Sequence, residues 1–145
     1  MKRKWENHEL VKHWSIDMEE HQRIRQKRGV NRLGFELLLK FFQLKGRFPE
    51  KKNEIPRVVR AFVAQQLSVD EGDYEQYNWE GRGIKRHRVE IRKLHGFHRM
   101  RKNEFDSLRQ WLIDEVVPQA VNERRLKILL YEELRVRKIE PPTDG

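Results

Sequence analysis

Apolar residues recur at helical spacing along almost the whole chain, and this periodicity limits the fold more than any other feature. No stretch of about four to eight residues alternates apolar and polar side chains between turn signals, as a half-buried strand would. The segment 33–44 is apolar on nearly every side, with only a narrow polar stripe of Glu36, Lys40 and Gln43. The sequence therefore predicts an all-α fold, a compact domain of about seven helices around a buried central helix.

Capping and terminating residues set the expected limits of these helices. Asp17 followed by Glu20 forms a capping-box pattern, Gly29 is expected to end that helix, and Asn103 is a candidate N-cap. A glycine-containing connection with one turn around 74–77 separates the fourth helix from the fifth. The expected helices cover about 6–13, 17–29, 30–45, 56–67, 84–95, 103–117 and 122–137.

Length and composition exclude several classes of protein. A chain of 145 residues is long enough to bury a core and is most simply one domain. It has no cysteine, which excludes disulfide frameworks, cysteine zinc sites and thiol catalysis. No apolar run approaches the roughly 20 residues that span a bilayer, so we expect a soluble, intracellular protein without a membrane partner.

The positive charge is concentrated in two short windows. The chain has a net charge of +9, whereas residues 23–32 alone carry +5 and residues 79–102 carry +7. The remaining sequence is therefore mildly acidic, at −3. Two solvated helix faces would be the ordinary explanation of such runs. A concentration that exceeds the whole net charge instead indicates a surface for a polyanion, and nucleic acid is the leading candidate.

The helix expected at 84–95 is the most informative element of the second window. One of its faces should dock on the core, and the rest of its circumference is basic and available to phosphates or bases. Only Glu90 could neutralise that charge from within the helix. The docking face comprises Ile84, His87, Ile91 and Leu94, and the basic face comprises Lys85, Arg86, Arg88, Arg92 and Lys93.

The first window surrounds a turn at Gly29. It places cations next to the N-terminus of the following helix, where the backbone N–H groups of residues 30–32 and the helix dipole would attract phosphate. Asn31 could bond a base edge or cap the turn. Cations near the end of the preceding helix would also stabilise it, and the two interpretations are compatible.

Together the windows supply the candidate DNA-binding residues. Lysines and arginines on phosphates would give affinity and register, while a few of Arg86, Arg88, Arg92 and Asn31 would read base edges. The complete candidate set is Arg25, Lys27, Arg28, Asn31, Arg32, Arg82, Lys85, Arg86, Arg88, Arg92 and Lys93.

Catalytic, metal-binding and cofactor-binding patterns find no support. The chain lacks a phosphate-cradling glycine loop and a serine nucleophile elbow, and its acids are scattered rather than convergent. His95 and His98 form the closest histidine pair but have no further ligand at suitable spacing, and His87 is better explained as a hydrogen-bonded core residue. We expect no enzyme activity, no metal, no cofactor and no small-molecule substrate.

Seven short motifs follow one another along nearly the whole chain. None is diagnostic alone, because each is brief, but their order and spacing are specific in combination. They are NRLGF at 31–35, GRFP at 46–49, IP at 55–56, FVAQQL at 62–67, YNWEGR at 77–82, KRHRVEIR at 85–92 and GF at 96–97.

In this order the motifs resemble the N-terminal region of Tn3-family transposases. The resemblance implies a DNA-binding region at the front of a longer bacterial transposase that recognises the terminal inverted repeats of a mobile element. The family's catalytic acids belong to a later RNase H-like domain, so this chain would bind ends without cutting them. The implied partners are double-stranded DNA and the remainder of the transposase, in the bacterial cytoplasm and associated with the nucleoid. The expected organisation is a helical DNA-binding domain at 1–139 and a linker-like tail at 140–145.

Two other functions remain open at the level of sequence. The basic face could meet an acidic protein or another part of the same transposase, and competition by non-specific DNA would separate that case. A helical RNA-binding module is also compatible with the absence of predicted strands, and a comparison of duplex DNA with duplex RNA would decide between them.

Overall fold

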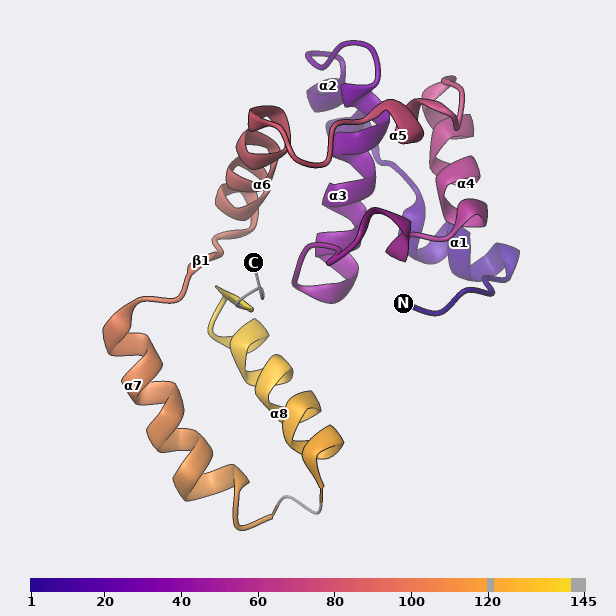
Figure 1. Cartoon of the computed structure of the whole chain (residues 1–145). Helices are drawn as coiled ribbons and strands as arrows, with labels where there is room; N and C mark the ends of the chain where they lie inside the picture. Colours follow the sequence, from indigo (N-terminus) through magenta and orange to yellow (C-terminus); the bar gives the residue numbers. More distant parts are fainter. Residues whose placement is uncertain (120–121, 142–145) are drawn as a thin grey trace. The chain divides into compact units, whose positions relative to one another are not determined.

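The computed structural model describes residues 1–119 and 122–141, which are almost entirely helical (Figure 1). Eight α-helices lie in these residues, and the extended structure is limited to two strands of two residues each. The contacts divide the chain into two compact units, Met1–Ile91 and Arg92–Gly145. The all-α fold class is therefore confirmed, while the expected domain limits stay a prediction.

The first unit is built around helix α3. It contains α1 (Asn7–Trp14), α2 (Met18–Ile24), α3 (Asn31–Lys45), the 3-10 turn η1 (Lys52–Glu54), α4 (Arg57–Leu67), α5 (Asp73–Gln76) and most of α6 (Arg82–His95). Helix α3 contacts α1, α2, α4 and α5, and its run from Leu33 to Phe42 is buried throughout. The predicted central buried helix is confirmed. The core around it comprises Leu10, Trp14, Leu33, Leu37, Phe41, Ile55, Val59, Val63, Ala64 and Tyr74.

The ends of the helices follow the capping chemistry in most places. The Asp17 side chain accepts from the Glu20 N–H, and the two residues form the predicted capping box at the start of α2. Helix α2 nevertheless ends at Ile24 rather than at Gly29, because closed turns follow, in which the Lys27 N–H bonds to the Ile24 carbonyl. Gly29 itself adopts the left-handed conformation, with φ 58°, that the return of the chain into α3 requires.

The second unit is a short helical hairpin. After the end of α6 it contains β1 (His98–Arg99), α7 (Lys102–Trp111), the π-helical turn η2 (Leu112–Val116), α8 (Glu123–Val136) and β2 (Ile139–Glu140). Its buried centre is formed by Leu108, Leu134 and Ile139. The expected N-cap Asn103 is wrong, because helix α7 begins at Lys102 and Arg101 takes the N-cap position, where its backbone N–H donates to Glu104 Oε1 at 3.0 Å.

The end of the chain is partly structured. The strands β1 and β2 pair in parallel, with Arg99 opposite Glu140. Glu140, which the sequence assigned to the linker-like tail, therefore belongs to the folded second unit. Residues 142–145 of that tail lie outside the described residues. No helix in the described part of the chain is long and apolar enough to cross a membrane.

A buried polar cluster lies between α2 and α3. Two members of the predicted polar stripe of α3 are not solvated, because Glu36 is fully buried and Lys40 is nearly so, whereas Gln43 is exposed. Lys40 Nζ donates to Glu20 Oε1 at 2.7 Å, and the other Glu20 oxygen and both Glu36 oxygens have no further partner among the described residues. Burial, followed by the charge of Glu20, raises the pKa of Glu36 to about 9. At neutral pH Glu36 is therefore a protonated acid, which gives it an O–H donor beside the Glu20 carboxylate.

Candidate nucleic-acid interface

Helix α6 presents one apolar side to the core of the first unit. Ile84 and Ile91 are buried, and His87 is only 7% exposed, so three members of the predicted docking face are confirmed. The fourth, Leu94, is 40% exposed and lies past the boundary of this unit, so its assignment to the docking face is wrong. The opposite side of the helix in this unit carries Arg82, Lys85, Arg86 and Val89, all exposed.

His87 anchors α6 to the core by a hydrogen bond. Its Nδ1 lies 2.6 Å from the Tyr77 hydroxyl oxygen, and its ring packs edge-on against Phe35 at 5.2 Å. Burial lowers the pKa of His87, and the positive charge of Lys27 lowers it further while Glu90 opposes the shift. The imidazole is therefore held neutral, and the prediction of a hydrogen-bonded core histidine is confirmed.

The turn after α2 lies directly against α6. Lys27 Nζ forms an ion pair of 2.7 Å with Glu90 Oε2, across 63 residues of sequence. The same ammonium group lies 4.6 Å from the centre of the Phe35 ring, and Arg32 Nε donates to the Lys27 carbonyl at 2.9 Å. These three contacts fix the position of Lys27 and join the two basic windows within one unit.

The two windows consequently contribute to adjoining surfaces. Arg82, Arg86 and Glu90 are four residues apart and lie along one side of α6, which leads to the ion pair with Lys27. Both windows also hold exposed cations that make no ion pair with any acid in the described part of the chain. The exposed side chain of Asn31 lies at the start of α3 beside them. We call the following set the basic surface: Arg25, Arg28, Arg82, Lys85 and Arg86.

Four of the candidate residues make contacts that serve the fold, and one of them is Arg32, whose Nε donates to the Lys27 carbonyl. Arg92 is buried and donates to Glu140 Oε2 at 2.7 Å, so the expectation that it reads a base edge is wrong for this arrangement. The guanidinium of Arg88 lies 5.7 Å from the Phe48 ring and 5.6 Å from the Trp79 ring, which favours a packing role. Lys27 is engaged by Glu90, as described above.

The predicted phosphate site at the N-terminus of α3 is weaker than the sequence suggested. The N–H groups of Asn31 and Arg32 bond to the carbonyls of Arg28 and Gly29, at 3.2 and 3.3 Å. Donors that are already engaged have less to offer an anion. Lys93 is exposed but belongs to the second unit, so it is no part of the basic surface.

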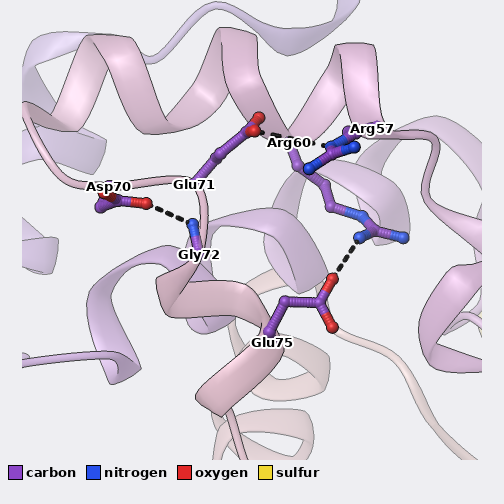
Figure 2. A pocket seen from close by; sticks show the side chains of 6 residues that line it. All are labelled: Arg57, Arg60, Asp70, Glu71, Gly72 and Glu75. Carbon is purple, nitrogen blue, oxygen red and sulfur yellow. Dashed lines mark hydrogen bonds and ion pairs between the residues drawn. The ribbon is translucent and has the colours of Figure 1, made fainter.

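A second group of charged residues in the first unit consists of cations that pair with neighbouring acids. Figure 2 shows a shallow pocket in which Arg57 pairs with Glu71 at 3.5 Å and Arg60 with Glu75 at 3.0 Å. Asp70 accepts from the Gly72 N–H at 2.7 Å. The cations of this pocket are paired with the acids beside them, in contrast to those of the basic surface.

Sequence reasoning missed the role of Glu90. It counted this acid only as a local neutraliser of its own helix, whereas Glu90 binds Lys27 of the other window. The sequence did contain a signal for this contact, because Glu90 is a single acid in a strongly basic helix and the chain has a second basic window with which it could pair. The structural contribution of the pair can be measured directly.

We expect a double-mutant cycle of Lys27→Met and Glu90→Gln to give a coupling energy of about 0.5 to 1 kcal/mol in urea denaturation. The pair is partly shielded, with side chains 19% and 37% exposed. The matched control is Arg57 with Glu71, a longer and more exposed pair, whose coupling should be near zero. Equal coupling in both cycles would show that the Lys27–Glu90 contact does not hold the turn.

One comparison with known protein families bears on this chain. The sequence pattern of a family described as a domain of unknown function, DUF4158, matches residues 1–143.

Proposed function

The chain belongs to the DUF4158 family of domains of unknown function, and we propose that it is a non-catalytic domain that binds double-stranded DNA through the basic surface. The observation that carries this proposal is the Lys27–Glu90 ion pair, which brings two basic windows together. The resemblance to Tn3-family transposases supplies the further proposal that the bound DNA is the terminal inverted repeat of a mobile element. The remainder of such a transposase would then be the second partner.

Duplex DNA suits this surface because its charge is regular and dense. The five cations of the basic surface are exposed and have no acidic partner among the described residues, so binding phosphate does not require an existing ion pair to be broken. DNA carries one negative charge per roughly 1.7 Å of helix axis and releases condensed counterions when cations replace them. Acidic protein surfaces offer neither that density nor that release of ions.

The salt dependence of affinity provides the first test. If the five cations each neutralise one phosphate, the logarithm of the binding constant should fall with the logarithm of salt concentration with a slope of about −4.5. Affinity for a duplex of about 30 base pairs, measured by fluorescence anisotropy, should then fall by a factor of about 500 between 50 and 200 mM salt. A salt-independent affinity would exclude the basic surface as the binding site.

A triple variant of the basic surface provides the second test. Substituting Arg28, Arg82 and Arg86 by Gln should reduce the slope by about 3 and weaken binding at least tenfold in about 100 mM salt. The control substitutes Lys4, Lys45 and Lys51 by Gln, which removes the same charge from exposed positions outside the basic surface. Equal weakening in both variants would show that net charge, and not this surface, determines binding.

The same assay separates the other two functions. A protein-interaction module would bind no duplex DNA under these conditions. An RNA-binding module would bind duplex RNA more tightly than duplex DNA of the same sequence. A helix that reads the major groove would do the reverse, because the major groove of duplex RNA is too narrow to admit it.

A further inference from the structure

One residue on the outer side of α6 differs in character from its neighbours. Among the exposed residues of α6 in the first unit, Val89 is the one with a hydrocarbon side chain, and 40% of it is accessible. It follows Arg86 by three residues, Lys85 by four and Arg82 by seven, so it lies on the same side of the helix as these cations.

Neither the core nor the helix accounts for valine at this position. The apolar side of α6 is formed by Ile84 and Ile91, which are buried, so Val89 adds little to the docking of the helix. A β-branched residue also forms helix less readily than alanine, lysine or glutamate would. Val58 on α4 is equally exposed, so what distinguishes Val89 is its place among the exposed cations Arg82, Lys85 and Arg86.

The major groove of DNA offers such an apolar group at one base. Thymine carries a C5-methyl group at the edge of the major groove, and small apolar side chains contact it there. In the minor groove no methyl group is displayed. We infer that α6 enters the major groove of DNA and that Val89 contacts a thymine methyl group there; this inference rests on the proposed function. Arg82, Lys85 and Arg86 would lie around Val89 and contact phosphates or base edges. Val89 is thus a specificity-determining residue of the binding surface.

This contact would also distinguish DNA from RNA by chemistry as well as by groove shape. Uracil lacks the C5-methyl group, and a thymine-to-uracil exchange in a DNA duplex leaves the phosphates and the Watson–Crick edges unchanged. Such an exchange isolates the methyl group that Val89 would touch.

The test uses the full chain and a duplex of about 30 base pairs selected from a random DNA library. Each thymine of the selected duplex is replaced singly by deoxyuridine, and affinity is measured by anisotropy. At one position the wild type should lose affinity about fourfold, the value of roughly one buried hydrocarbon group. In Val89→Ala that loss should disappear, while sensitivity at other positions stays as in the wild type.

Val58→Ala is the matched control, because Val58 is 42% exposed on α4, outside the basic surface. It should keep the wild-type response to every exchange. If all exchanges are neutral in a protein that binds DNA, or if the sensitive position persists in Val89→Ala, the inference about Val89 is overturned and the proposed function stands. If the selection yields no duplex that binds, the proposed function fails and this inference with it.

Discussion

Replacing Gly34 by Ala should destabilise the protein by about 3 kcal/mol or more and lower its melting temperature by roughly 6 to 12 °C. Gly34 is buried in α3, and a Cβ atom built there would overlap the Tyr77 ring, reaching its Cε1 at 2.5 Å. The ring has no room to retreat, because it is buried and hydrogen bonded to His87. The gain of about 1 kcal/mol in helix propensity does not offset this overlap.

Gly83→Ala provides the matched control for that substitution. Gly83 also lies in a helix, α6, but apart from its chain neighbours and the backbone of its own helix no atom lies within 4 Å of a Cβ built there. The same change should therefore leave the free energy of unfolding unchanged or raise it by up to about 1 kcal/mol. Urea denaturation of the two variants measures both effects. If Gly34→Ala is as stable as the wild type, the close approach of Tyr77 to α3 does not exist.

Replacing Glu36 by Gln should stabilise the protein at neutral pH, with a gain that grows as pH rises. The pKa of Glu36 is about 9 in the folded protein, because of burial and the neighbouring Glu20, against an ordinary value of 4.5 for a glutamate. Between these values the folded state holds a proton that the unfolded state has released, so stability falls as pH rises. The fall is about 1.4 kcal/mol per pH unit and reaches about 3 kcal/mol at pH 7. Glutamine removes this penalty and retains a donor toward Glu20.

Urea denaturation at pH values between about 5 and 9 tests the effect of Glu36. The difference in the free energy of unfolding between Glu36→Gln and the wild type should be small at the acid end and should increase steadily toward pH 9. Glu50→Gln is the control, because its side chain is exposed, and it should show no such increase. A Glu36→Gln variant that is less stable than the wild type at pH 7 would contradict a protonated Glu36.

The helices could be predicted from the sequence because the residues that determine a helix lie close together along the chain. Apolar spacing and capping residues lie within a few positions of each other, so the limits of α1, α3 and α6 were predicted to within about two residues. The end of α2 was missed because turns close the helix before Gly29, and Lys27 in those turns pairs with Glu90, 63 positions away in the sequence. Local patterns contain no record of such a pairing.

The sequence predicted which segments of the chain carry the basic charge, but it did not predict which residues of those segments are exposed. Charge density identified both windows, yet it could not distinguish Arg86, which is exposed, from Arg92, which pairs with Glu140, 48 residues later in the sequence. Both arginines lie on the same helix and carry the same charge. Only tertiary packing separates a cation that pairs with an acid distant in sequence from one that faces solvent.

Because the ion pair between Lys27 and Glu90 joins two separate windows, the basic surface is built from residues that are discontinuous in the sequence. A peptide cut from residues 23–32 contains two of the five cations, and one cut from residues 79–102 contains the other three, but neither reproduces their relative placement. The basic surface therefore forms only when the first unit folds, and the DNA binding that we propose should be lost along the same denaturation curve as the native structure.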